Sequence, residues 1–215
     1  VIANGDDANT RKAIEDVPVP VITFGYGSGN DYAAANVRRR ADGIGYRYDL
    51  MHGGVRLTEV ETGIPGEHNV LNSLAAIAAA MQAGVSAEEA AAGVKTFRGA
   101  HRRFEVLGTK NGITIADDYA HHPREIEVTL RAAKELGFKH IWAVHQPFTY
   151  SRTAMLLDDF ARVLSLADHV VLSEIMGSRE YNTYNVYAAD LAAKIPGCVW
   201  CPAFEEIARY VMEHA

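Results

Sequence analysis

From about residue 98 onward, short apolar runs alternate with longer amphipathic runs, and this alternation limits the folds open to the chain. The apolar runs have the length and the β-branched content of strands: RFEVLGT, GITIADD, HIWAVH, HVVLSEI and CVWC. The amphipathic runs have helical periodicity: REIEVTLRAAKELG, TAMLLDDFARVLSLA, NVYAADLAAKI and AFEEIARYVMEH. The alternation predicts a Rossmann-like α/β fold, with a mostly parallel sheet covered on both faces. Asn111 and Gly112 predict a hairpin between the first two strands.

The first 97 residues have a different pattern and predict a separate α/β unit. Strand-like runs are VIA, VPVITFGY, ADGIGYRYDL and GVRLTEVET, and an early helix lies in NGDDANTRKAIED, with Asn9 or Thr10 as its cap. A longer helix, NVLNSLAAIAAAMQAG, ends at Gly84, and Ser86 and Glu89 stand at capping-box spacing ahead of another. We therefore predict two domains, residues 1–97 and 98–215.

The glycine-rich stretch GYGSGND, residues 25–31, has a superficial likeness to a phosphate-binding loop. It does not open a helical pattern, so we predict a hairpin-type turn there instead. The chain begins in mid-element and without an initiating Met, and we interpret it as part of a longer protein.

The composition and net charge of the chain disfavour several classes of function. The chain has 215 residues, 48% of them hydrophobic and 22% charged, which is ordinary for a globular protein. No apolar run is long enough to span a bilayer and no signal segment is evident, so we expect a cytoplasmic protein without a membrane partner. The net charge of −6 disfavours a nucleic-acid partner. Cys198 and Cys201 lie in a strand-like stretch and lack a second pair, so we interpret them as structural thiols.

Three predicted strands of the second unit are followed by unusually polar segments. These are DDYAHHP after GITIA, HQPFTYSRT after HIWAV, and SEIMGSREYNTYN after HVVL. Ligands of open parallel sheets bind outside the carboxyl ends of the strands. We therefore expect all three segments to line one edge of the second unit, where a ligand would bind.

The acids of DDYAHHP are the more informative residues of that segment. A carboxylate at a strand end can accept both hydroxyls of a ribose. Asp117 and Asp118 alternate in direction, so we expect one to face the ligand and the other to support the turn. His121 or His122 could equally cap the helix that Pro123 opens, and a metal site built on this pair is the least favoured alternative.

Two further groups suggest nucleotide binding, and each has a structural alternative. Asn69 and Asn72 stand three apart at a helix start, and an amide can pair with the amino and N7 edge of adenine. Helix capping explains them about as well. Arg103 in HRRFE could bind phosphate oxygens, although an exposed arginine is more often inert.

Taken together, these motifs resemble the Mur ligase family. The residues that carry the resemblance are GEHNVLNSLAA, HRRFE, DDYAHHP and QPFTYSRT, in this order, and NGDDANTRK resembles a turn late in the family's central domain. The resemblance implies a three-domain enzyme, of which this chain would hold the end of the central ATPase domain and the C-terminal domain. Such enzymes transfer the γ-phosphate of ATP to a carboxylate, and an amine then attacks the acyl phosphate. The likeness is strongest to members that join L-alanine to UDP-N-acetylmuramate in peptidoglycan synthesis.

The resemblance also implies roles for individual residues. ATP would be bound by His68, Asn69, Asn72, Arg103 and Asp118, with the two amides on adenine, Arg103 toward the phosphates and Asp118 on the ribose. Tyr119, His121 and Arg152 would face the muramoyl substrate.

The sequence departs from the family pattern at Phe148, where many members have His, and at Ala120, where Gly is common. It contains no G-x-x-x-x-G-K-[ST] loop, and the family's magnesium ligands also lie upstream of the matched region. We therefore expect the chain by itself to lack catalytic residues, and to be inactive although the parent enzyme uses ATP and Mg²⁺. Alternatives are a ligase that recycles muramoyl tripeptides, a non-catalytic nucleotide-binding module, and a metalloprotein based on the nine histidines.

Overall fold

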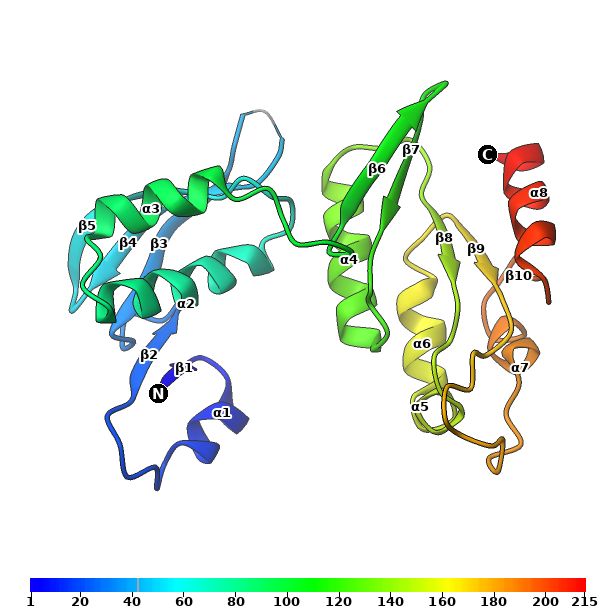
Figure 1. Cartoon of the computed structure of the whole chain (residues 1–215), viewed down its shortest axis with the longest axis horizontal. Coiled ribbons are helices and arrows are strands. Elements are labelled where there is room, and N and C mark those ends of the chain that lie inside the picture. Colours follow the sequence, from blue (N-terminus) through cyan, green and yellow to red (C-terminus); the bar gives the residue numbers. More distant parts are fainter. Residues whose placement is uncertain (42) are drawn as a thin grey trace. The chain divides into compact units, whose positions relative to one another are not determined.

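A computed structural model describes residues 1–41 and 43–215. Asp42, which belongs to one of the runs predicted as strand-like, lies outside the described residues. The chain forms two compact units, Val1–Ala100 and His101–Ala215 (Figure 1). Each unit is an α/β structure with its own core, as the sequence predicts.

The first unit contains a five-stranded mixed sheet with helices over one face (Figure 1). Its strands, which lie in chain order, are β1 (Ile2–Asn4), β2 (Ile22–Gly25), β3 (Tyr32–Arg39), β4 (Tyr46–His52) and β5 (Val55–Glu61). Strands β1 to β3 are parallel, whereas β3 to β5 are antiparallel. Helices α2 (His68–Gln82) and α3 (Ala87–Thr96) bury their apolar stripes on this sheet, and α1 (Ala8–Ala13) follows β1.

The ends of these helices follow the local chemistry of the chain. Gly84 adopts φ 91° just after α2, a conformation that favours glycine. Ser86 and Glu89 form the predicted capping box at the start of α3. The predicted cap of α1 is wrong: Asp7, rather than Asn9 or Thr10, accepts the hydrogen bond from the backbone N–H of Thr10 at 2.7 Å.

The predicted hairpin-type turn at residues 25–31 is also wrong, because β2 and β3 pair in parallel, with Phe24 opposite Tyr32. The carboxylate of Asp6 organises this connection. It accepts hydrogen bonds from the backbone N–H of Tyr26 and, at 2.8 Å, from the side-chain amide of Asn30. The loop amides that could cradle a phosphate therefore already hold an anion of the chain itself.

The second unit combines a hairpin with a three-stranded parallel sheet. The hairpin consists of β6 (Glu105–Lys110) and β7 (Ile113–Asp117), and the sheet has the order β10 (Val199–Trp200), β9 (His169–Leu172), β8 (Trp142–His145). Its helices are α4 (Pro123–Glu135), α5 (Tyr150–Met155), α6 (Leu157–Leu164), α7 (Ala188–Ala192) and α8 (Phe204–His214). Figure 1 shows α4 and α6 on one side of the sheet and α8 on the other.

These observations confirm the parallel sheet and correct two details. The turn at Asn111 and Gly112 has φ 53° and 83°, the left-handed geometry that the Asn-Gly pair predicts for a hairpin. The hairpin forms a two-stranded sheet of its own instead of joining the parallel one. The run predicted as one helix from residue 153 begins earlier, at Tyr150, and breaks at Leu156, where φ −120° and ψ 25° interrupt the helix.

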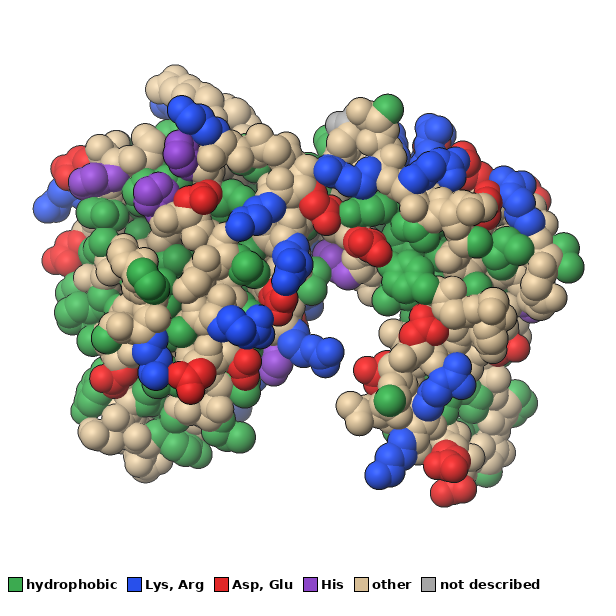
Figure 2. Space-filling view, turned by 180° about the vertical axis from the view of Figure 1, so that it is seen from behind, with side chains coloured by type: hydrophobic (Ala, Val, Ile, Leu, Met, Phe, Trp, Pro, Cys, Tyr) green, Lys and Arg blue, Asp and Glu red, His purple; other side chains and the backbone are tan. Residues whose placement is uncertain are grey.

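Charged side chains cover the faces that the cores leave open. On the sheet of the first unit, Arg56 pairs with Asp49 at 2.8 Å and Arg38 pairs with Glu59. Figure 2 shows acidic and basic side chains interspersed over the surface. None of the helices in the described part of the chain has the length and apolar character needed to cross a membrane.

His145, at the end of β8, is partly buried, and its Nε2 atom is enclosed within the second unit. Its ring lies beside Phe160, with 5.8 Å between the ring centroids, and its Nε2 atom has no partner among the described residues. Burial lowers the pKa of His145 to about 4, because the interior disfavours the imidazolium. The native second unit therefore contains a neutral histidine that the unfolded chain would protonate below its ordinary pKa of about 6.5.

This shift predicts a loss of stability in mild acid. Between the unfolded pKa near 6.5 and the folded pKa near 4, the unfolded state binds more protons, so the free energy of unfolding falls as the pH falls. From pH 7.5 to pH 5.0 the loss from His145 should be about 2 kcal/mol. Urea unfolding of the chain and of its His145→Leu variant at both pH values measures it. An equal pH dependence in the two proteins would contradict the assignment.

Candidate functional site

The first unit has a pocket of about 400 Å³ between α2 and α3, here called the α2–α3 pocket. Its walls are mostly apolar and come from both helices and from the segments after β5 and α3: Ile64, Ala76, Ile77, Ala80, Val94 and Phe97. Its polar lining includes Asn69 and Asn72 from the first turns of α2. Apolar walls with a few polar groups are typical of pockets for small molecules.

The side chains of Asn69 and Asn72 are hydrogen-bonded to each other, and the bond has a defined direction. The Asn69 side chain donates to the carbonyl of Pro65 at 2.7 Å, and its oxygen accepts from the Asn72 side chain at 2.9 Å. Neither caps α2, whose N-cap is Glu67 without a side-chain bond. Asn69 thus holds Asn72, whose exposed amide keeps an oxygen and one N–H for a ligand. His68, the first residue of α2, is also exposed.

In the second unit, Asp118 supports the turn, although the resemblance assigns this residue to the ribose. Its carboxylate accepts hydrogen bonds from the backbone of Phe104 at 2.9 Å and Ala120 at 2.7 Å, and from the hydroxyl of Thr129 at 3.1 Å. Asp117, also partly exposed, pairs with Arg102 at 2.9 Å. The structural role within DDYAHHP therefore belongs to Asp118, which has few lone pairs left for a ribose.

Arg103 lies on a strained turn that leaves its side chain exposed. The residues on either side, Arg102 and Phe104, have φ 55° and 47°, which is unfavourable for side chains with a Cβ atom. Hydrogen bonds to Glu105 at 2.8 Å and to Asp118 hold this geometry. Strain of this kind, stabilised by neighbouring groups, is common at ligand-binding sites. Nothing in the sequence of HRRFE predicts it.

Tyr119, His121 and Arg152 come together from two of the three polar segments. Tyr119 is 44% exposed and lies edge-on to His121, with ring centroids 5.2 Å apart. Nδ1 of His121 lies 2.8 Å from the carbonyl oxygen of Tyr119. The Arg152 guanidinium donates to the carbonyl of His121 at 3.4 Å, and the Phe148 ring lies 6.0 Å from the His121 ring. His122 is the residue that caps α4, with Pro123 in the first turn.

The third polar segment is held against the second by a residue that sequence reasoning missed. Glu180 accepts hydrogen bonds from the backbone N–H and the hydroxyl of Ser151, at 2.8 and 2.5 Å. These hydrogen bonds, together with the nearby charge of Arg152, lower the pKa of Glu180. The start of α5 thus already carries the carboxylate of Glu180.

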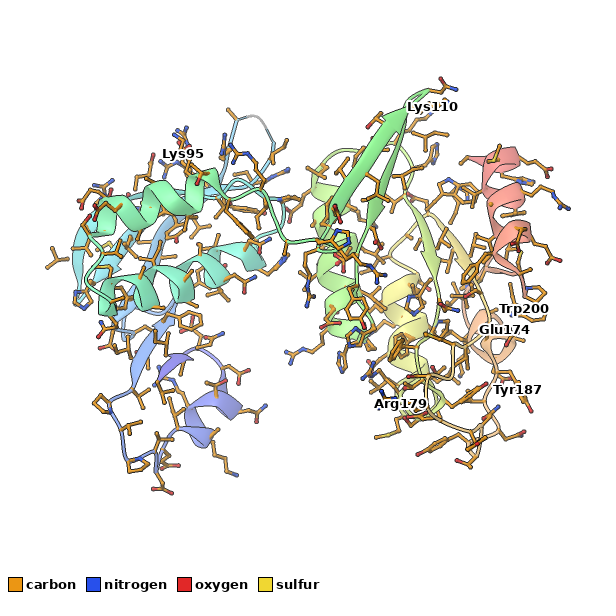
Figure 3. The ribbon with its side chains drawn as sticks, viewed as in Figure 1. Lys95, Lys110, Glu174, Arg179, Tyr187 and Trp200 are labelled. Carbon is orange, nitrogen blue, oxygen red and sulfur yellow. The ribbon has the colours of Figure 1, made fainter. Side chains whose placement is uncertain are left out.

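Backbone contacts complete this edge of the second unit. The N–H of Met176 donates to the carbonyl of Pro147 at 2.9 Å, and the Gln146 amide donates to the carbonyl of Glu174 at 3.4 Å. Figure 3 labels Glu174 and Arg179 on this segment. The predicted convergence of the three polar segments is therefore present, although β7 does not belong to the parallel sheet.

Other candidate chemistry is weaker. Among residues 1–41 and 43–215, no group of three or more His, Cys, Asp and Glu side chains is arranged to hold a metal ion. Cys198 and Cys201 are free thiols. Burial raises the pKa of Cys198 to about 11, so this thiol is a poor nucleophile at neutral pH.

Two family models match the chain. The model of the Mur ligase middle domain matches residues 1–80, and that of the Mur ligase glutamate ligase domain matches residues 102–215. A UDP-N-acetylmuramate–L-alanine ligase of Lachnospira eligens is 42% identical over 220 residues, covering 100% of this chain and 48% of that protein. The ligase of the same name from Alkaliphilus metalliredigens is 41% identical, covering 100% of the chain and 47% of that protein.

Solved structures show the same relationship. A UDP-N-acetylmuramate–alanine ligase from Thermotoga maritima is similar with a TM-score of 0.74 and 27% identity, over 97% of this chain and 44% of that one. A murein peptide ligase from Psychrobacter arcticus has a TM-score of 0.70 and 28% identity, over 100% of this chain and 45% of that one. The chain spans about half the length of the curated relatives it matches. It belongs to the Mur ligase family.

Proposed function

We propose that the chain is the nucleotide- and substrate-facing part of an ATP-dependent ligase that joins L-alanine to UDP-N-acetylmuramate. In this proposal residues 1–97 are the end of the central ATP-binding domain and residues 98–215 are the C-terminal ligase domain. The identity of about 40% to ligases of that name supports the substrates. The observation that carries the nucleotide assignment is the α2–α3 pocket with its ordered pair of amides.

The adenine ring would lie in the α2–α3 pocket, where apolar walls replace water on its faces. Asn72 would pair with the amino and N7 edge, using the oxygen and the N–H that remain after its bond to Asn69. Asn69 would act mainly by fixing the Asn72 amide, and His68 would stand at the exposed start of the helix. This order of roles refines the prediction that both amides contact adenine.

In the second unit we assign Arg103 to the phosphates and Asp118 to the ribose. The strained turn presents Arg103 as an exposed cation, and a guanidinium can bind two phosphate oxygens at once. Asp118 would add at most one further hydrogen bond, because its carboxylate already holds three. We therefore propose a single ribose contact for this residue.

The group of Tyr119, His121 and Arg152 is our proposed contact for the muramoyl substrate. The carboxylate of UDP-N-acetylmuramate is anionic before activation, and Arg152 supplies a positive charge beside His121. In the proposed reaction the carboxylate attacks the γ-phosphorus and ADP leaves. The amino group of alanine then attacks the acyl carbon, loses a proton, and inorganic phosphate departs. These residues would orient the substrates, since phosphoryl transfer depends mainly on positioning and electrostatic stabilisation.

Among the described residues, no group of three or more His, Cys, Asp and Glu side chains could hold a metal ion by itself. In this proposal the metal and the phosphate loop are supplied by sequence outside the chain, so no step is assigned to them here. We propose that the enzyme acts in the cytoplasm, because its proposed substrates are nucleotides. A ligase that recycles muramoyl peptides is the second candidate, favoured by the TM-score of 0.70 to a murein peptide ligase. Comparing alanine with a muramoyl-accepting tripeptide in the same assay distinguishes the two.

The adenine assignment predicts that Asn72→Ala weakens adenosine binding to the chain. Loss of a bidentate amide pair should raise the dissociation constant about tenfold or more from a wild-type value near the millimolar level. An NMR titration with adenosine measures it. Gln82→Ala, an exposed change at the far end of α2, is the control and should leave the binding unchanged. If Asn72→Ala binds adenosine as tightly as the wild-type chain does, the assignment of adenine to this pocket is wrong.

The hydrogen bonds of the two acids predict different effects of amide substitution. Asp118→Asn removes charge from three internal hydrogen bonds and should destabilise the second unit by about 2 kcal/mol. Asp117→Asn breaks one half-exposed pair and should cost at most about 1 kcal/mol. Thermal unfolding measures both. If Asp118 holds the ribose, its variant should also bind ATP more weakly while its affinity for 2′,3′-dideoxy-ATP stays that of wild type.

The substrate assignment predicts that Arg152→Ala lowers kcat/KM for the muramoyl substrate about 10- to 100-fold, with little change in melting temperature. The assay needs a protein that also carries the upstream half present in the relatives, and it follows phosphate release. Arg162→Ala, which removes an exposed arginine of α6, is the matched control. Unchanged kinetics in Arg152→Ala would remove this residue from the site.

A further inference from the structure

Glu61, the last residue of β5, lies at the centre of a group of cations from β4, from α3 and from the segment after β3. Its carboxylate contacts Arg47 of β4 at 2.5 Å, Lys95 of α3 at 3.1 Å and Arg40 at 3.9 Å. The Glu61 side chain is only 12% exposed, whereas that of Lys95 is 61% exposed. The hydrogen bond from Lys95 and the three positive charges lower the pKa of Glu61, so it is ionised at neutral pH.

The ion pair of Glu61 and Lys95 joins the end of β5 to the end of α3 at a wall of the α2–α3 pocket. Thr62 and Gly63, which follow Glu61, line the pocket, as do Val94 and Phe97 on either side of Lys95. Lys95 lies in the last turn of α3 and is labelled in Figure 3.

Gly63 shows how close the two segments are. A Cβ atom on Gly63 would lie 2.6 Å from the carbonyl oxygen of Phe97 and 3.1 Å from that of Lys95. There is therefore no room for a side chain at residue 63. The close approach is possible because α3 ends at Thr96, just before Phe97. The position of the Phe97 wall is therefore set by the attachment of the α3 end to β5.

We propose that Glu61, acting through Lys95, is a positioning residue for the adenine-binding pocket. The ion pair holds the end of α3 against β5 and so fixes the spacing between the Phe97 wall and the amides of α2. Neither charged group touches the base in this arrangement. The inference rests on the proposed binding of adenine in the α2–α3 pocket and adds a determinant of affinity that lies outside its lining.

Lys95→Met is the informative change, because it removes the more exposed partner and leaves Glu61 paired with Arg47. Arg56→Met is a matched control: the Arg56 side chain is 54% exposed and pairs with Asp49, which is 14% exposed, on the same sheet but away from the pocket. Both variants should lose similar, small amounts of thermal stability. Lys95→Arg keeps the charge and should retain wild-type binding.

Adenosine is the probe, titrated into the whole chain and followed by NMR. Lys95→Met should raise the dissociation constant about three- to fivefold, and Arg56→Met should leave it unchanged. If the wild-type chain binds adenosine and Lys95→Met binds it equally well, the positioning role is wrong while the pocket assignment stands. If adenosine shifts no resonance of the α2–α3 pocket in the wild-type chain, the proposed function itself fails. Equal weakening by Lys95→Met and Arg56→Met would reduce the effect to general stability and would also overturn the proposal.

Discussion

Backbone N–H groups that leave a sheet or open a helix must find new partners, and single carboxylates supply many of them in this protein. Asp6 gathers the loop between β2 and β3, and Asp118 joins the turn at Phe104 to the start of α4. Glu180 holds the start of α5. A carboxylate suits this role because it offers several lone pairs and its hydrogen bonds are stronger than those of neutral acceptors. The segments that we assign to ligand binding depend on these anchors for their shape.

This use of acids explains where sequence reasoning succeeded and where it failed. Periodicity and capping signals predicted both α/β units, the parallel sheet and the hairpin at Asn111, because these features depend on local sequence. The parallel pairing of β2 with β3 was not predicted, and the loop between them is held by Asp6, which is far from it in sequence. Glycine content alone indicates a turn but does not set the direction of the strand that follows it.

In the candidate site, too, some features could be predicted from the sequence and others could not. The pairing of Asn69 with Asn72 was accessible from their spacing on one helix face, and the contact of His121 with Arg152 follows from the convergence of strand ends. The structural role of Asp118 could not be predicted from the sequence, because an acid that binds a ligand and one that binds the backbone look alike in sequence. Glu180 was missed for a related reason, since its partner Ser151 lies in another segment.

The anchors also change the electrostatic character of the edge that carries them. A net charge of −6 argues against binding an anion if it is taken as a property of the whole surface. At the edge of the second unit, however, Asp118 and Glu180 direct their negative charge at backbone amides and hydroxyls of their own unit. Arg103 remains exposed there. The net charge of the whole chain therefore does not decide whether an anion could bind at this edge.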